Sequence, residues 1–231
     1  MNIYGHQKTT LLDYPGQVAT TIFTGGCNFR CPFCHNSDLA INTNNIMPIQ
    51  EEEILTFLAK RKKVLSGICI TGGEPTLQPD LPSFIKKVRA LGYKIKLDTN
   101  GYLPDKLTDL LNENLLDYIA MDIKAGFSNY SKVSGIPNFK IEPIIKSISV
   151  IENSGVDYEF RTTVVKELHN KQDFYEIKDM LSPQSSYYLQ SFQDSGNILS
   201  KGLSALDKST LTEYLAILQT RLPKAKFRGI D

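Results

Sequence analysis

Residues 18–36, VATTIFTGGCNFRCPFCHN, contain the signals that decide how this chain folds and what it binds. The first seven residues are apolar or β-branched and predict a strand, after which two glycines allow a sharp turn. Three cysteines follow with the spacing C-x3-C-x2-C, at Cys27, Cys31 and Cys34. Random placement of four cysteines gives this spacing roughly once in two thousand arrangements, so the cluster needs a chemical cause.

Working outward from this stretch, apolar, β-rich runs alternate with helical patterns six times. The predicted strands are 18–24, 67–71, 94–98, 118–122, 158–165 and 187–192. The predicted helices are 49–64, 81–91, 104–114, 142–153, 170–181 and 207–222. Asp80 is the expected N-cap of the second helix, and Gly92 and Gly155 stand where helices end.

Such alternation is typical of a parallel α/β sheet with right-handed crossovers. A closed eightfold barrel needs about 250 residues, whereas this chain offers six repeats. We therefore predict an α/β fold, either a partial (β/α)6 TIM-like barrel or an open wound sheet. No linker or internal repeat interrupts it, so a single domain over residues 1–231 is expected.

The composition excludes several classes of protein. The 26 Lys+Arg and 25 Asp+Glu residues leave a net charge of +1, which gives no long-range attraction to nucleic acid or to an anionic membrane. No run reaches the roughly 18 apolar residues of a membrane span, and the start is not signal-like. A cytoplasmic globular protein is expected, with neither nucleic acid nor membrane as its partner.

Polar residues gather where the predicted strands end. These residues are 24–27, 71–75, 98–101, 122–124 and 190–193. Active sites of barrels and wound sheets lie at the carboxyl ends of the strands. The pattern therefore predicts an enzyme whose site is built from these loops.

The cysteine loop suits a metal centre better than a disulfide, because three thiols leave one unpaired and the cytoplasm is reducing. A structural zinc site takes four ligands, and His35 is badly placed to join its neighbour Cys34. Iron–sulfur clusters are held by thiolates, usually four, so three would leave one iron open. Three buried thiols, or a zinc site lacking a ligand, remain the alternatives.

The motif C-x3-C-x2-C, with Phe33 before the last cysteine, resembles the signature of the radical S-adenosylmethionine (SAM) superfamily. The stretches 10–16 (TLLDYPG), 23–36, 72–75 (GGEP) and 98–101 (DTNG) resemble activating enzymes of glycyl-radical enzymes. Within that family, the likeness is greatest to the activating proteins of anaerobic ribonucleoside-triphosphate reductase. It extends from about residue 3 to residue 193.

This resemblance implies a mechanism. Cys27, Cys31 and Cys34 would hold a [4Fe-4S] cluster whose open iron binds the amino and carboxylate groups of SAM. One electron, from a flavodoxin or ferredoxin, would cleave SAM to a 5′-deoxyadenosyl radical. That radical would take a hydrogen atom from a glycine Cα of the partner enzyme, anaerobic ribonucleoside-triphosphate reductase. The protein supplies orientation and excludes water.

Within this resemblance, the GGEP turn and Asp98 are expected to bind the methionyl group of SAM. Glu74 would accept hydrogen bonds from the ammonium, and Gly72 and Gly73 would expose backbone polar groups along the ligand. The alternative for this segment is an ordinary strand-to-helix turn.

A second set of charged residues follows the next strands. Asp98 and Asp122 would repel each other in one cleft unless a cation or ammonium separates them, so Asp122 with Thr99 could complete a monovalent cation site. Lys124 could reach the SAM carboxylate or simply pair with Asp122. Arg161, inside a strand, must have its charge paired, by a ligand carboxylate or by Asp122.

The remaining candidates are less charged. Phe33 could stack on the adenine or anchor the loop, and Val164 could line the adenine. Gln193 stands where some related activases carry a histidine for the ribose. His169 is expected at the surface and Cys69 in the core.

Two other functions compete with the activase. One is a superfamily enzyme that acts on a small molecule, such as a 7-carboxy-7-deazaguanine synthase, although those usually have an altered cysteine spacing. The other is a non-enzymatic metal-binding protein, which gives no reason for GGEP or DTNG. No second cysteine cluster is encoded, which disfavours members with auxiliary clusters.

Overall fold

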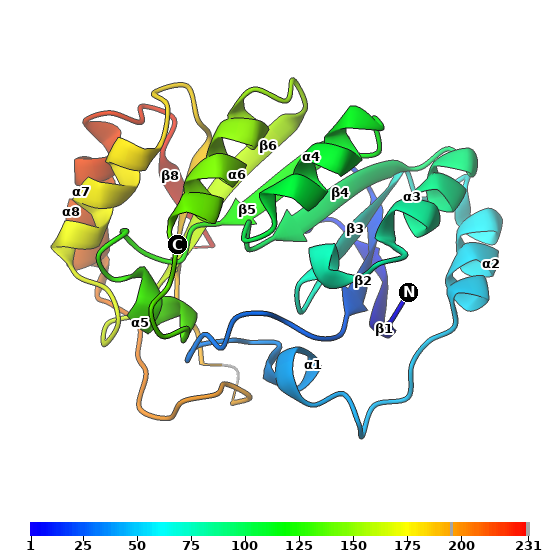
Figure 1. Ribbon diagram of the computed structural model, residues 1–231, viewed down its shortest axis with the longest axis horizontal. Coiled ribbons are helices and arrows are strands. Elements are labelled where there is room, and N and C mark those ends of the chain that lie inside the picture. The colour runs from blue at the N-terminus through cyan, green and yellow to red at the C-terminus, as the bar shows by residue number, and fades with distance from the viewer. Residues whose placement is uncertain (195, 230–231) are drawn as a thin grey trace. The chain divides into compact units, whose positions relative to one another are not determined.

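The computed structural model describes residues 1–194 and 196–229 (Figure 1). The chain forms two compact units, which are described separately. Unit 1 comprises Met1–Asn28, Asn36–Thr99 and Asp105–Ala120. Unit 2 comprises Phe29–His35, Asn100–Pro104 and Met121–Asp231.

Unit 1 begins with an antiparallel pair of strands and continues with parallel ones. Its strands are β1 (Ile3–Thr10), β2 (Ala19–Thr24), β3 (Gly67–Gly72), β4 (Lys94–Thr99) and the start of β5 (Tyr118–Asp122). β1 runs antiparallel to β2, whereas β2, β3 and β4 are parallel. The core of β3, Ile68 to Ile70, is completely buried, as expected of a strand covered on both faces.

The helices of unit 1 connect these strands. They are α1 (Ser37–Ile41), α2 (Glu51–Arg61), the 3₁₀ helix η1 (Pro75–Leu77), α3 (Leu81–Ala90) and α4 (Pro104–Asn112). α2 and α3 lie side by side (Figure 1).

Unit 2 contains the end of β5 and three more strands. These are β6 (Asp157–Val164), β7 (Tyr187–Ser191) and β8 (Lys226–Arg228). They are parallel, with Thr162 opposite Leu189 and Gln190 opposite Arg228. The helices are α5 (Tyr130–Ser134), α6 (Glu142–Glu152), α7 (Lys171–Met180) and α8 (Lys208–Gln219). α7 and α8 pack together (Figure 1), and Phe174 stacks on Tyr214 at 4.3 Å.

The predicted fold class is confirmed. Neighbouring strands follow chain order from β1 to β8 in a mixed sheet that is not closed, and all six predicted strands and all six longer predicted helices are present. Among the described residues the sheet has eight strands, two more than the six predicted. The two strands that were not predicted are β1 and β8. β1 reads IYGHQKTT, whose polar middle hides the strand pattern, and β8 has only three residues.

Two of the three predicted helix boundaries behave as expected. Gly92 and Gly155 have φ values of 85° and 74°, the left-handed conformation that glycine adopts most easily. Asp80 does precede α3, but its carboxylate makes no capping bond and instead pairs with the amino terminus at 2.9 Å. In the part of the chain that is described, no helix is long and apolar enough to cross a membrane.

Candidate active site

The first part of the cysteine loop packs against the GGEP turn within unit 1. The Gly26 carbonyl accepts a hydrogen bond from the Glu74 backbone N–H at 2.8 Å. A Cβ on Gly73 would lie 2.0 Å from the Gly26 oxygen, so a larger residue cannot fit there. This close approach gives Gly73 a packing role, and the predicted contacts of Gly72 and Gly73 with a ligand stay predictions.

The three loop cysteines are thiols and do not form disulfides with one another. Cys31 is buried, whereas Cys27 and Cys34 are half-buried. The Cys34 N–H donates to the Cys31 carbonyl at 3.1 Å, which closes a tight turn in unit 2; Cys27 belongs to unit 1. Thiolates are the usual ligands of iron–sulfur clusters, so this donor set fits a [4Fe-4S] cluster.

The geometry of a single-ion site was not found. Among residues 1–194 and 196–229, no three Cys, His, Asp or Glu side chains converge closely enough to hold one metal ion. The thiolates of a [4Fe-4S] cluster each bind a different iron, so such convergence is not required of them. The assignment of Cys27, Cys31 and Cys34 as cluster ligands therefore stays a prediction.

Glu74 has a structural role that the sequence did not indicate. Its side chain is 1% exposed. Its Oε1 accepts hydrogen bonds from Thr76 N–H at 3.1 Å, from Thr76 Oγ1 at 2.5 Å and from Thr99 Oγ1 at 2.7 Å. Glu74 thus caps η1 and ties the GGEP turn to the end of β4. Its contact with the SAM ammonium stays a prediction.

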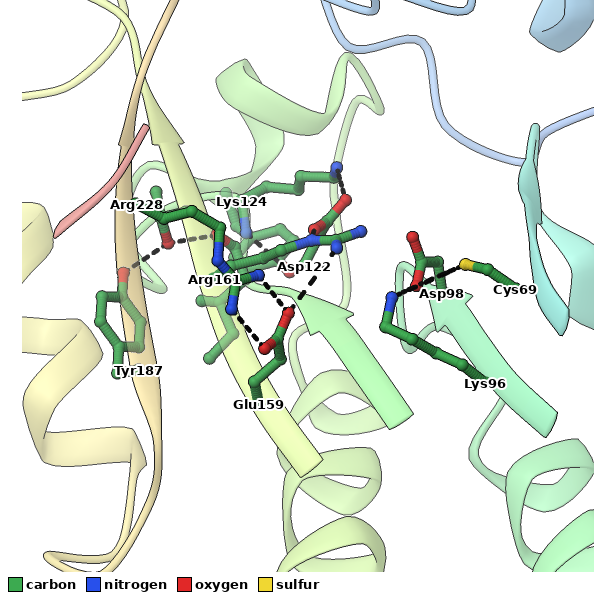
Figure 2. Close-up of polar contacts among 12 residues, drawn as sticks. Cys69, Lys96, Asp98, Asp122, Lys124, Glu159, Arg161, Tyr187 and Arg228 are labelled. Carbon is green, nitrogen blue, oxygen red and sulfur yellow. Dashed lines mark hydrogen bonds and ion pairs between the residues drawn. The ribbon is translucent and has the colours of Figure 1, made fainter. Parts of the chain in front are cut away.

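Asp98 lies beside a buried lysine (Figure 2). Lys96 Nζ donates to Asp98 Oδ1, and the Cys69 thiol lies 3.6 Å from the same oxygen. Lys96 is 1% exposed and Cys69 is fully buried, which confirms the core position predicted for Cys69. Sequence reasoning missed Lys96, although alternation along β4 places it on the same face as Asp98. We call Glu74, Lys96 and Asp98 the acidic group.

In unit 2, Asp122 binds two cations (Figure 2). Arg161 Nε donates to Asp122 Oδ1, and Lys124 Nζ donates to Oδ2 at 2.9 Å. Burial alone would raise the pKa of Asp122, but the charges of Arg161 and Lys124 outweigh it and hold that pKa well below its usual range. For both Arg161 and Lys124, the alternative in which the cation pairs with Asp122 is therefore observed.

Lys124 also faces the cysteine loop of unit 2. Burial would lower the pKa of Lys124, but Asp122 and then Cys31 raise it far above its usual range. Its Nζ lies 5.9 Å from the ring centre of Phe33, which is 5% exposed and contacts His169 edge-on at 6.3 Å. Phe33 therefore anchors the loop, and its stacking on adenine stays a prediction.

The predicted surface position of His169 is wrong. The side chain is buried, its Nδ1 accepts a hydrogen bond from Val165 N–H at 3.0 Å, and its Nε2 donates to the Lys124 carbonyl at 2.8 Å. Burial lowers the pKa of His169, which keeps the ring neutral. The loop after β6 folds inward through these backbone bonds, which no local sequence pattern indicates.

Glu159 and Arg228 form a second ion pair that sequence reasoning missed. Arg228 donates to both Glu159 oxygens, at 2.5 and 2.6 Å, and Glu159 is fully buried (Figure 2). We call Asp122, Lys124, Glu159, Arg161 and Arg228 the basic group, because its cations outnumber its carboxylates by one.

Three members of the basic group, Asp122, Arg161 and Arg228, line a pocket of about 580 Å³ within unit 2. Its lining includes His35, Asp122, Arg161, Gln190, Gln193 and Arg228. His35 Nε2 donates to the Gln193 carbonyl at 2.7 Å, and the His35 ring stacks on Phe192. Gln193 is exposed at the pocket edge, whereas Val164 is completely buried. The contacts of both with SAM stay predictions.

A comparison with known families identifies the superfamily. The sequence profile of the radical SAM superfamily matches residues 21–181, more than half of the chain. The chain belongs to the radical SAM superfamily. Membership implies a [4Fe-4S] cluster and SAM, as expected from the cysteine motif.

Several relatives are glycyl-radical activases by name. A candidate glycyl-radical enzyme activating enzyme of Methanocaldococcus jannaschii is 32% identical over 83% of this chain and 80% of its own length. The pyruvate formate-lyase-activating enzyme of Clostridium pasteurianum is 28% identical over 74% of this chain and 71% of its own length. A candidate GTP 3′,8-cyclase of Saccharolobus solfataricus is 33% identical, but over 55% of this chain and 42% of its own length.

Solved structures support the same fold. SuiB of Streptococcus suis, bound to its precursor peptide SuiA, has a TM-score of 0.69 at 16% identity. The match covers 90% of this chain and 48% of SuiB. The enzyme anSMEcpe with bound AdoMet has a TM-score of 0.59 at 17% identity, over 85% of this chain and 57% of its own. At such identities the likeness shows the fold alone.

Proposed function

We propose that this radical SAM enzyme installs a glycyl radical on a partner enzyme. The observation that carries the proposal is Lys124, a half-buried cation that donates to Asp122 and lies 5.9 Å from the ring centre of Phe33 in the cysteine loop. A cation held next to the cysteine loop would attract the carboxylate of SAM when the ligand is bound. The activase relative that spans 83% of this chain supports the choice of partner class.

In this proposal Cys27, Cys31 and Cys34 hold the [4Fe-4S] cluster, which when bound supplies the electron that cleaves the SAM sulfonium. Lys124 and Arg161 bind the SAM carboxylate through charge-assisted hydrogen bonds. In the acidic group, Glu74 and Asp98 accept hydrogen bonds from the ammonium.

The other assignments belong to the same proposal. The partner is anaerobic ribonucleoside-triphosphate reductase, and a flavodoxin or ferredoxin is the electron donor. The chain acts in the cytoplasm as one domain over residues 1–231. A monovalent cation at Asp122 and Thr99 would have to compete with Lys124 and Arg161, which already bind both Asp122 oxygens.

The test is anaerobic reconstitution of the chain, followed by electron paramagnetic resonance (EPR) of mixtures with the anaerobic reductase of the same organism. A stable glycyl radical should form on the reductase in the presence of SAM and reductant. The radical should be absent when the cluster is absent.

A small-molecule substrate is the second candidate, supported by the similarity to a GTP 3′,8-cyclase and by the polar pocket in unit 2. The same assay separates the two. If no partner gains a radical, and a small molecule accelerates SAM cleavage and is itself converted, the activase proposal is wrong.

A further inference from the structure

Arg228, at the end of β8, donates two hydrogen bonds from its guanidinium to a carboxylate on β6. Its Nη1 and Nη2 donate to Glu159 Oε1 and Oε2 at 2.5 and 2.6 Å (Figure 2). The guanidinium carbon lies 3.6 Å from the ring centre of Tyr188 on β7. A two-point contact to a carboxylate, combined with stacking on an aromatic ring, fixes an arginine side chain firmly.

Glu159 needs this partner because its carboxylate is fully buried and a buried charge must be compensated. Arg161 lies two residues along β6 and so points to the same face of the strand. Its Nη1 is 3.9 Å from Glu159 Oε1, while its Nε donates to Asp122. Two carboxylates therefore compete for the guanidinium of Arg161.

Arg228 binds one of these two carboxylates, Glu159, and so affects which of them Arg161 contacts. Because it donates to both oxygens of Glu159, Arg161 keeps its close contact with Asp122 and stays at the pocket, whose lining includes both arginines. Without Arg228, Glu159 would lose its two short hydrogen bonds, and its charge would draw Arg161 away from Asp122. Asp122 would then be left with Lys124 alone among the basic group.

We propose that Arg228 is a positioning residue for SAM binding: by neutralising Glu159, it keeps Arg161 and Lys124 arranged around Asp122 for the carboxylate of SAM. The inference rests on the proposed function, in which Lys124 and Arg161 bind that carboxylate. It gives β8, a strand of three residues, a direct part in forming the binding site.

The experiment compares Arg228→Gln with the double variant Glu159→Gln/Arg228→Gln. The Kd of SAM is measured on the anaerobically reconstituted full chain by equilibrium dialysis, and the reduced cluster is followed by EPR as SAM is added. Loss of a residue that orients a ligand-binding side chain typically weakens binding about tenfold. Arg228→Gln should therefore raise the Kd of SAM by about that factor. The double variant should return to within about threefold of wild type, because the competing carboxylate is also gone.

Two further variants make the result specific. Lys226→Gln changes an exposed cation on the same strand and should leave the Kd unchanged. Arg228→Lys keeps the charge but loses the two-point contact, and it should raise the Kd by about threefold. This variant carries the test if Arg228→Gln does not fold.

The inference is overturned if Arg228→Gln and Arg228→Lys bind SAM as wild type does, or if the double variant binds as weakly as Arg228→Gln. A merely structural loss of β8 would give the second result. Failure of the wild-type chain to bind SAM with its cluster assembled would instead overturn the proposed function, and this inference with it.

Discussion

The acidic group of unit 1 and the basic group of unit 2 have formal net charges of opposite sign. In the acidic group, Asp98 pairs with Lys96 while Glu74 accepts hydrogen bonds from the hydroxyls of Thr76 and Thr99, so the formal charges of its three members sum to one negative charge. In the basic group, three cations surround two carboxylates and leave one positive charge. The proposed function assigns one charged end of the methionyl group to each of the two groups: the ammonium to the acidic group and the carboxylate to the basic group.

The pair of Asp98 with Lys96 and the pair of Asp122 with Arg161 also differ in how deeply they are buried. The side chains of Lys96 and Asp98 are 2% and 13% exposed, whereas those of Arg161 and Asp122 are 17% and 31% exposed and border a pocket. Removing one partner of a buried pair typically costs about 3–5 kcal/mol of stability. Changes at Asp98 or Lys96 should therefore cost more stability than changes at Asp122 or Arg161.

The largest effect should come from the cluster loop, because neither group can act on SAM without the cluster. Cys31→Ala should abolish both the bound iron, about four per chain in wild type, and SAM cleavage. Iron analysis and the ultraviolet–visible spectrum after reconstitution measure this. Cys69→Ala is the matched control, and it should retain the cluster. Retention of a full cluster by Cys31→Ala would show that the ligands are assigned wrongly.

Asp98→Asn tests the acidic end of the comparison. Loss of a charge-assisted hydrogen bond costs about 1.5–3 kcal/mol, so the Kd of SAM should rise by about 10- to 100-fold. Decarboxylated SAM keeps the ammonium, so its Kd should rise by the same factor. Equilibrium dialysis with both ligands measures this. An effect on SAM without an effect on decarboxylated SAM would place Asp98 at the wrong end of the ligand.

Lys124→Met tests the basic end with the same two ligands. The Kd of SAM should rise by about tenfold, because one charged donor to the carboxylate is lost. Decarboxylated SAM has no carboxylate, so its Kd should change little. Equal weakening of both ligands would mean that Lys124 only orients Asp122 and the loop.

The fold could be predicted from the sequence further than the site could. The six predicted strands are rich in apolar, aromatic and β-branched residues, and such runs are visible in one sequence. β8 could not be found this way, because three residues carry no periodicity. Its role depends on pairing with β7, which only the folded chain brings to it.

The same reason explains the uneven prediction of the site. Asp98, Asp122 and Lys124 stand at strand ends and were identified from position alone. The pair of Glu159 and Arg228 joins residues 69 positions apart, and nothing in the sequence links them. Lys96 had a signal, its alternation with Asp98, but a lysine in a strand is ordinarily solvated.

The smallest expected effect is a pH dependence of the stability that Asp122 of the basic group contributes. The pKa of Asp122 is held below its usual range, so its ionised form stabilises the fold above the unfolded pKa of about 3.9, and this contribution is lost as the pH falls below that value. Asp122→Asn removes the contribution. The variant should unfold more readily in urea at pH 7, and its deficit should shrink by about 1 kcal/mol between pH 5 and pH 3. A deficit that stays constant over this range would show that the charge of Asp122 does not stabilise unit 2.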